Sequence, residues 1–420
     1  MSDAHATITA FLTGAQDAQT RFLAALVEVP SDNPPGDCLA HAERAAALLQ
    51  ELGFSVERHP VPDAQVKQVG MARAVNLVVR RRFGDGPVIA LNTHGDVVPP
   101  GEGWTHDPYG AEIVDGWMYG RGVAVSKSDF ATYAYALLAL EKIAAAGTPL
   151  AGTVELHFTY DEESGGEIGP RWLIEEGISK PDLALGAGFS YAVVNAHNGC
   201  LHLEVRVEGR SAHAAMPATG VDALQAATHI LSALYAGRES LAARVSDIPG
   251  IGGPQLTVGL IAGGINTNVV PDRVTFRLDR RMIPEEKPAE VEADLRALIA
   301  EAAIAYPEAA VSVRRILLAE PLLPAEGGRR LADVLCAHAS RIMGEPVVAK
   351  GVPLYTDARH YAAAGIPIVL YGAGPHTIQE ANAHRADERL PLDDLYKATQ
   401  VVALTLCDLL TGAPIRRTKP

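Results

Sequence analysis

The sequence predicts an α/β protein in which a central, mostly parallel sheet is covered by helices and a second, smaller α/β domain is inserted. Three apolar runs, AVNLVVRRR, PVIALNTHGD and GTVELHFTYDEE, are bounded by turn residues and have the length of buried strands. Helical patterns lie between them, from Asp129 to Gly147 and from Pro170 to Gly177. This alternation is typical of a parallel sheet with helices on its faces.

The elements can be followed along the chain. Residues 6–28 repeat apolar positions at helical spacing, SDNPPGD ends that helix, and AHAERAAALLQELGF predicts a second one. After PDLALGAG, LHLEVRVEG alternates as a half-exposed strand and GVDALQAATHILSALYAG forms an amphipathic helix. Two strands, a helix and a last strand follow: PQLTVGLIAGG, VVPDRVTFRLDRR, KPAEVEADLRALIAEAAIAY and AVSVRRILLA.

This βαββαβ order is that of a ferredoxin-like domain with two helices on one face of its sheet. From about Pro321 the chain returns to buried strands and helices, which should complete the first sheet. A chain of 420 residues also exceeds the size at which one core usually stops growing. We therefore predict one domain from residues 1–198 and 319–420, and an inserted domain from residues 199–318.

Composition limits the classes of partner. A hydrophobic fraction of 48% and a charged fraction of 20% are those of a globular protein. The net charge of -14 argues against a nucleic acid or an anionic membrane as partner, and favours a small molecule. The sequence contains no membrane-length apolar run and does not begin with a signal-peptide pattern, so we expect a cytoplasmic protein. Its four dispersed cysteines are expected to be reduced, buried thiols.

The first candidate site residues follow a predicted strand in LNTHGDVVP. His94 and Asp96 are two residues apart, so on an extended chain their side chains point the same way. His94 can offer a ring nitrogen to a metal while Asp96 orients the ring. They lie where an open α/β sheet normally binds its ligand. The alternative is a buried histidine satisfied by a neighbour.

The second candidate cluster is TYDEESGGE, in which three consecutive acids end another predicted strand. Adjacent carboxylates repel each other, and a cation removes that conflict. Of the pair Glu162 and Glu163, one can bind the metal while the other accepts a proton from water as general base. The alternative is a solvated acidic loop. His384, just beyond the last predicted strand, is a further candidate ligand.

The ordered set HGD, GRG, DEESGG, AHAAMP, GGINTNVVPD, TDAR and AHRADE covers nearly the whole chain. As a set, these motifs resemble the co-catalytic metallohydrolases that include acetylornithine deacetylase, succinyl-diaminopimelate desuccinylase, aminoacylase and glutamate carboxypeptidase. The resemblance implies that His94, Glu163 and His384 are metal ligands, that Asp96 orients His94, and that Glu162 is the general base.

The resemblance also implies roles for the inserted domain. In this family that domain mediates dimerisation, so we expect a homodimer. His213, in the segment SAHAAMP, corresponds to a histidine that polarises the substrate carbonyl in the partner's site. Asn268 and Arg359, with Arg281 as a weaker candidate, resemble groups that bind a substrate carboxylate or amide. The alternatives are a turn for GGINTN and a surface ion pair for Arg359.

Two departures from the family pattern concern the metals. The family's GRGxxDxKGG reads GRGVAVSKSD here, so Val125 stands in place of the bridging aspartate. A second acidic ligand, in a segment like GEP, is missing from GAGFSY. Asp129 lies about one helical turn late as a substitute. We therefore predict one divalent metal per chain, Mn, Zn or Co, held by His94, Glu163 and His384.

Three functions follow from this pattern. The first is a metal-dependent hydrolase that cleaves the C–N bond of an N-acyl amino acid or dipeptide. The second is an aminohydrolase that releases ammonia from an amino-aromatic acid, as the single-metal relative 5-nitroanthranilic acid aminohydrolase does. The third is a non-catalytic dimeric binding protein. Retention of both Glu162 and Glu163 argues against the third, because a dead site needs no base beside a ligand.

Overall fold

The computed structural model describes residues 3–412, which divide into two compact units. The larger unit contains the described residues up to Asn195, Pro324–Lys350 and those from Thr356 onward. The smaller unit consists of Ala196–Leu323 and Gly351–Tyr355, so it includes a short return segment that the sequence did not mark. The predicted fold class is confirmed, with a sheet and covering helices in each unit.

The larger unit is built on an eight-stranded sheet in the order β1-β2-β6-β3-β7-β14-β8-β13. Its central strands β6, β3, β7 and β14 are parallel, whereas β1, β2 and β8 pair antiparallel. The central strands are almost fully buried, as continuous apolar runs require when helices cover both faces. The strands are Val56–Pro60 (β1), Val75–Arg82 (β2), Val88–His94 (β3), Thr153–Thr159 (β6), Leu183–Gly186 (β7), Val193–His197 (β8), Ala349–Val352 (β13) and Ile368–Leu370 (β14).

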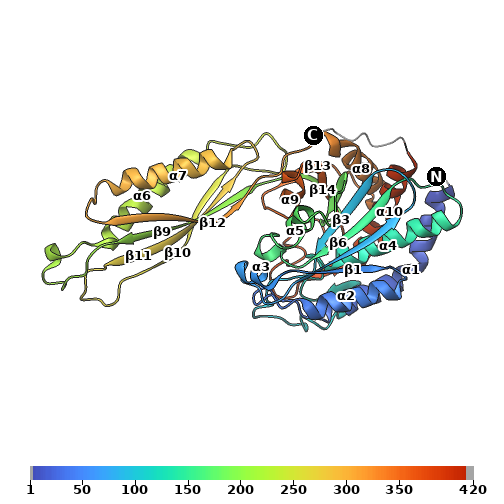
Figure 1. Cartoon of the computed structure of the whole chain (residues 1–420), viewed down its shortest axis with the longest axis horizontal. Coiled ribbons are helices and arrows are strands. Elements are labelled where there is room, and N and C mark those ends of the chain that lie inside the picture. Colours follow the sequence, from blue (N-terminus) through green and yellow to red (C-terminus); the bar gives the residue numbers. More distant parts are fainter. Residues whose placement is uncertain (1–2, 413–420) are drawn as a thin grey trace. The chain divides into compact units, whose positions relative to one another are not determined.

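Helices pack around this sheet, and α4 is the most buried of the long ones (Figure 1). Apolar residues occur all round α4, which packs against β3, β6, α1 and α10 and so has almost no solvent face. The helices of the larger unit are Asp3–Val27 (α1), Leu39–Glu51 (α2), Asp63–Gln68 (α3), Lys127–Ala145 (α4), Pro170–Glu175 (α5), Arg329–Met343 (α8), Ala358–Ala363 (α9) and Leu392–Thr411 (α10).

A three-stranded sheet in the order β15-β5-β4 was not predicted. Its strands are Ile113–Val114 (β4), Trp117–Tyr119 (β5) and Arg389–Pro391 (β15). Strands of two or three residues are too short to show an alternating pattern. This sheet matters for the site because β15 follows the loop that carries His384, while β5 leads into the GRG segment.

The smaller unit has a four-stranded antiparallel sheet in the order β10-β11-β9-β12, with α6 and α7 together on one face (Figure 1). The βαββαβ order follows the sequence prediction. Alternate residues of β9 are buried against the helices, as a half-exposed strand requires. The elements are Gly199–Glu208 (β9), Ala223–Leu241 (α6), Gln255–Gly263 (β10), Arg273–Met282 (β11), Pro288–Ala303 (α7) and Ala310–Ala319 (β12).

Two further expectations can be compared with the described residues. None of the helices in this part of the chain is long and apolar enough to cross a membrane. The cysteines form no disulfide there; Cys38, Cys200 and Cys407 are buried, whereas Cys336 is only half-buried.

Candidate active site

His94 is the last residue of β3, and Asp96 follows it at the carboxyl end of the sheet. Both side chains are buried. His94 Nδ1 lies 2.9 Å from the backbone oxygen of Asp96 and 3.4 Å from its Oδ1 atom. Because a carbonyl oxygen only accepts, Nδ1 carries the proton and Nε2 keeps the lone pair that a metal needs.

The carboxylate of Asp96 also holds the acidic turn. The turn Glu162–Ser164 (η1) follows β6, whose Thr159 pairs with His94 of the parallel neighbour β3. Asp96 Oδ1 accepts a hydrogen bond from the backbone amide of Glu162 at 3.2 Å, and Oδ2 accepts from that of Glu163 at 3.1 Å. One carboxylate therefore fixes the histidine and the acidic pair together.

Asn33 is a further partner of the Asp96 carboxylate and donates from Nδ2 to Oδ2 at 3.0 Å. It comes from the SDNPPGD loop, for which the sequence predicted only a break between helices. No signal in the sequence separates this asparagine from an ordinary turn residue.

His94, Glu162 and Glu163 each offer one ligand atom within 4.8 Å of the other two. His384 Nε2 pairs with the buried oxygen Glu163 Oε1 at 3.3 Å. His384 has a φ of 60°, a left-handed conformation that a non-glycine residue adopts at a cost of roughly 1 kcal/mol or more. The nitrogen and oxygen atoms of His94, Glu162 and Glu163 lie close enough together to fit a divalent cation, and His384 is joined to them through Glu163.

The electrostatics of the cluster support this fit. Burial raises the pKa of Glu162 to about 8, against the lowering effect of His94 and with the help of Glu163 and Asp96. Burial alone would lower the pKa of His94, but the hydrogen bond with Asp96 and the charge of Glu162 raise it well above its usual value. A bound cation would keep the carboxylates ionised and His94 neutral.

A buried ion pair supports the loops on the other side of His384. Arg121 Nη1 donates to Glu388 Oε2 at 2.6 Å, and both side chains are almost fully buried. Glu388 also accepts backbone amides from Gly122, Ala124 and Val125 at 3.1 Å each. The GRG and AHRADE motifs are evident in the sequence, but the contact between them was not predicted. The opposite charges of Arg121 and Glu388 in these two motifs were a signal that the motifs could pair.

Comparison with known proteins places these residues in a family. The model of peptidase family M20/M25/M40 matches residues 90–408. The chain is 30% identical to a succinyl-diaminopimelate desuccinylase of Sphingopyxis alaskensis over 90% of this chain and 94% of that protein. It is 29% identical to an acetylornithine deacetylase of Myxococcus xanthus, over 88% and 91% of the two chains. The chain belongs to the M20/M25/M40 family.

As a member of this family the protein is a metal-dependent hydrolase of C–N bonds. Its fold is similar to that of a Bacillus subtilis M20 protein described as a dinuclear metal-binding peptidase, with a TM-score of 0.67 and 17% identity over 95% of this chain and 99% of that one. The predicted family resemblance is thereby confirmed.

The M20/M25/M40 protein differs from the family pattern at Val125 and Asp129. The Val125 side chain is half-buried and packs against the hydrophobic core. The carboxylate of Asp129, at the start of α4, accepts the backbone amide of Ala373 at 2.8 Å and that of Gly188 at 3.1 Å. A Cβ atom at Gly372 would lie 2.1 Å from Asp129 Oδ1, so the backbone closes directly on this carboxylate. Asp129 therefore links the ends of β7 and β14.

Arg359 lies behind the acidic turn. Its side chain is buried, its guanidinium donates to the carbonyl oxygen of Gly165, and Nη2 lies 3.7 Å from Glu167 Oε1. The neighbouring His360 Nε2 is 2.8 Å from the same carbonyl. These contacts fix the chain that follows Glu162 and Glu163.

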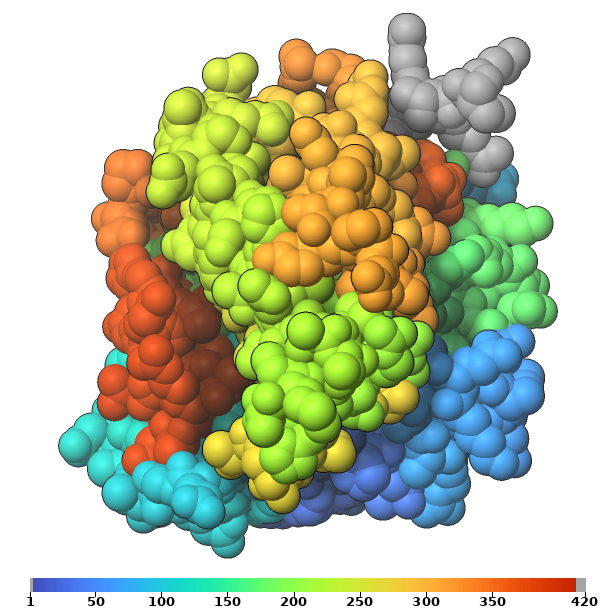
Figure 2. Space-filling model, turned by 90° about the vertical axis from the view of Figure 1, so that its left-hand side faces the viewer, coloured from blue at the N-terminus to red at the C-terminus, as the bar shows by residue number. Residues whose placement is uncertain are grey.

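His213, Asn268 and Arg281 belong to the smaller unit, so the described site in the larger unit does not contain them. The first two lie on adjacent loops, where the amide of Ala214 donates to the carbonyl oxygen of Asn268 at 3.0 Å. Figure 2 shows these loops side by side at the end of the smaller unit, in lime green and yellow. His213 and Asn268 are exposed. Arg281 lies on β11, where it pairs with Asp279.

Proposed function

We propose that this protein hydrolyses an amide bond of a small, carboxylate-bearing substrate of the N-acyl amino acid type, with one divalent metal. The observation that carries the proposal is that His94, Glu162 and Glu163 bring potential ligand atoms within 4.8 Å of one another, with His384 Nε2 3.3 Å from Glu163 Oε1. Glu162 stands beside these groups with its own carboxylate. The names of the matched relatives, a desuccinylase and a deacetylase, support an N-acyl substrate.

His94, Glu163 and His384 would hold the metal, which when bound supplies a Lewis acid that polarises the scissile carbonyl. Nitrogen and oxygen ligands suit Zn, Mn or Co. Asp96 keeps the His94 ring oriented and the acidic turn in place. Glu162 would accept a proton from the attacking water and return it to the leaving nitrogen, a role that its carboxylate can fill because it lies beside the proposed metal ligands without being one of them.

The residues at the positions where the family pattern has its further metal ligands, Val125 and Asp129, favour a single metal. Val125 offers no ligand atom, and both carboxylate oxygens of Asp129 already accept backbone amides. The segment after β7 brings Gly188 against the backbone of Tyr371, where an added Cβ would lie 2.9 Å from the amide nitrogen. No side chain can therefore be placed at Gly188 without a backbone shift.

The smaller unit would complete the substrate site in a homodimer. His213 and Asn268 are exposed on two hydrogen-bonded loops, which suits groups that contact a substrate carbonyl or carboxylate. Arg359 would position the acidic turn and not bind substrate, because its guanidinium already donates to the carbonyl oxygen of Gly165. A sedimentation measurement that gives a monomer, together with full activity of His213→Ala, would contradict the dimeric site.

The missing second set of ligands also favours a second candidate, an aminohydrolase that releases ammonia from an amino-aromatic acid. The same metal, base and carboxylate-binding groups would serve it. A direct assay separates the two: acid release from N-succinyl and N-acetyl amino acids against ammonia release from aminobenzoates. Turnover of the aminobenzoates alone would replace the amidase proposal by the aminohydrolase.

The general base is tested by Glu162→Gln. We expect kcat to fall by roughly 10²–10⁴-fold while the metal content stays at one per chain, because the amide cannot accept the proton. Glu175→Gln, an exposed glutamate that pairs with Arg171, is the matched control and should keep both values. Unchanged turnover in Glu162→Gln would remove Glu162 from the mechanism, and two metal ions per chain in the native protein would remove the single-metal site.

A further inference from the structure

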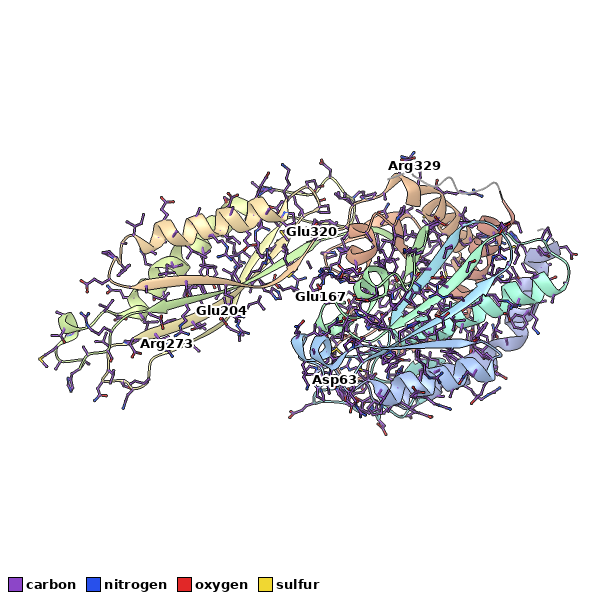
Figure 3. All side chains as sticks on the ribbon, in the orientation of Figure 1. Asp63, Glu167, Glu204, Arg273, Glu320 and Arg329 are labelled. Carbon is purple, nitrogen blue, oxygen red and sulfur yellow. The ribbon has the colours of Figure 1, made fainter. Side chains whose placement is uncertain are left out.

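The smaller unit contains a second cluster of metal-ligating side chains, on the face of its sheet that α6 and α7 leave open. Cys200 and His202 are two residues apart on β9, and Asp279 is the partner of His202 on the neighbouring strand β11. All three therefore belong to the face opposite the buried residues Leu201 and Leu203. In Figure 3, Glu204 of the same strand face extends from the side of the sheet away from the helices.

The three side chains converge on one point. His202 Nε2 lies 2.9 Å from Asp279 Oδ2 and 3.2 Å from Cys200 Sγ, and the sulfur lies 3.7 Å from the same carboxylate oxygen. Three potential ligand atoms of three chemical types thus meet within 4.8 Å. The side chains of His202 and Asp279 are 33% and 29% exposed, so an ion in solution can reach the cluster through them, whereas Cys200 is buried behind them.

This geometry is not that of a nucleophilic triad. Such a triad needs the thiol on one ring nitrogen of the histidine and the carboxylate on the other. In this cluster the thiol and the carboxylate both approach Nε2 of His202. In the metal-free protein the Cys200 thiol and His202 Nε2 can each donate a hydrogen bond to Asp279 Oδ2. A cation can replace both protons and bind all three side chains.

The separations also suit a tetrahedral metal. Bond lengths of about 2.3 Å to sulfur and about 2.1 Å to nitrogen and oxygen place tetrahedral ligands roughly 3.4–3.6 Å apart. The three observed separations, 2.9, 3.2 and 3.7 Å, differ from these values by about half an ångström or less. Small rotations of the partly exposed His202 and Asp279 side chains on two paired strands cover that difference.

Arg281 supports the carboxylate from behind. Its Nε donates to Asp279 Oδ1 at 2.9 Å, and its guanidinium carbon lies 5.6 Å from the centre of the Tyr355 ring. The same Nε lies 3.2 Å from Oδ2, the oxygen that also contacts His202 and Cys200. A carboxylate fixed by an outer partner is a common feature of metal sites.

We propose that Cys200, His202 and Asp279 bind a thiophilic divalent metal such as Zn²⁺, at a second site that is separate from the nitrogen and oxygen site of the larger unit. A thiolate with an imidazole selects Zn²⁺ over Mg²⁺, Ca²⁺ or Mn²⁺. Three protein ligands leave one coordination position for water or for an anionic group of a ligand. The site is independent of the proposed reaction, because it shares no residue with the proposed catalytic metal site.

Cobalt separates the two sites by spectroscopy. Full-length protein is stripped of metal with a chelator and titrated with Co²⁺, and the near-ultraviolet thiolate-to-cobalt charge-transfer band is recorded. The site of His94, Glu163 and His384 has no sulfur ligand, so this band reports only the cysteine site. We expect the band to saturate once about two equivalents of Co²⁺ have been added, one for each site, with an intensity that corresponds to one thiolate site per chain, and Zn²⁺ to displace it.

Variants then assign the band. It should be lost in Cys200→Ser and kept in the matched control Cys336→Ser, a half-buried cysteine of the larger unit. It should also be kept in Glu163→Ala, which removes a ligand of the other site. Absence of the band in folded native protein, or its persistence in Cys200→Ser, would overturn the proposal. If Cys200→Ser fails to fold, the presence or absence of the band in the native protein still tests the site.

Discussion

The two sides of the active centre differ in the partners of their polar side-chain atoms. On one side, His94, Glu162 and Glu163 bring potential ligand atoms within 4.8 Å, and Glu163 Oε1 pairs with His384 Nε2. On the other side, each carboxylate oxygen of Asp129 accepts one backbone amide, from Ala373 or Gly188. A cation would stabilise the first arrangement, because the adjacent carboxylates of Glu162 and Glu163 repel each other. The second already has hydrogen bonds from the protein backbone.

The Asp129 side is closed by packing and backbone contacts. Val125 packs against the core, and Asp129 ties together the ends of β7 and β14. The backbone at Gly372 approaches so closely that a Cβ there would meet the Asp129 carboxylate. We therefore expect that Val125→Asp alone does not create a second metal site.

The largest effect on turnover is expected from removal of the proposed metal ligand Glu163. Glu163→Ala removes a ligand whose oxygen lies 3.3 Å from His384 Nε2. We expect the metal content to fall to near zero and turnover to fall by about 10³-fold or more, since a bound metal supplies several kcal/mol of transition-state stabilisation. Elemental analysis and the amide assay measure the two quantities. Normal metal content in this variant would place the ion elsewhere.

A large loss of stability is expected from the pair that supports both sides. Arg121→Met leaves Glu388 buried without its cation, which should lower the free energy of unfolding by about 3–5 kcal/mol. Arg171→Met, which breaks exposed pairs with Glu167 and Glu175, is the control and should cost less than about 1 kcal/mol. Urea unfolding measures both. Equal losses in the two variants would show that the buried pair has no special role.

A smaller effect is expected at the closed side. Asp129→Asn keeps the size of the side chain but leaves one of the two backbone amides without an acceptor. We expect a loss of about 1–2 kcal/mol in unfolding free energy and no change in metal content. The metal content of Asp129→Asn is compared with that of Glu163→Ala. If Asp129→Asn also loses metal, Asp129 is a metal ligand, and the contrast between the two sides of the site is wrong.

The features of the fold and site that depend on local sequence pattern could be predicted from the sequence. Buried runs predicted the strands, and the acids and histidines that follow them predicted which side chains meet at the sheet edge. It could not supply contacts that depend on the folded path of loops. Asn33 reaches Asp96 from a turn, Arg121 meets Glu388 from a distant segment, and Arg359 lies behind the acidic turn. Each of these contacts joins two segments that are far apart in the sequence, and the sequence alone does not show that such segments meet in the folded protein.

The departures from the family pattern show the same limit. Val125 was enough to predict that a bridging carboxylate is missing. The position of Asp129 one turn later left open whether it replaces that ligand. Only the contacts with Gly188 and Ala373 distinguish a substitute ligand from a structural carboxylate. The backbone determines that choice, and side-chain identity alone does not.

The last comparison is the dependence of stability on pH, which also tests the state of Asp129. Burial raises the pKa of Asp129 from 3.8 to about 8, against the lowering effect of the amides of Ala373 and Gly188. An acid with a raised pKa in the folded state binds more protons folded than unfolded. Its contribution to stability is therefore present below about pH 4 and is lost as the pH rises towards about 8.

Urea unfolding of the native protein and of Asp129→Asn across this range isolates that contribution, because all other groups titrate in both proteins. We expect the difference in unfolding free energy between the two proteins to shrink as the pH rises. A carboxylate that binds a metal behaves in the opposite way, since the cation holds it ionised and the difference would then grow with pH. The sign of this slope therefore decides whether Asp129 belongs to the closed side of the site or to the side that binds metal.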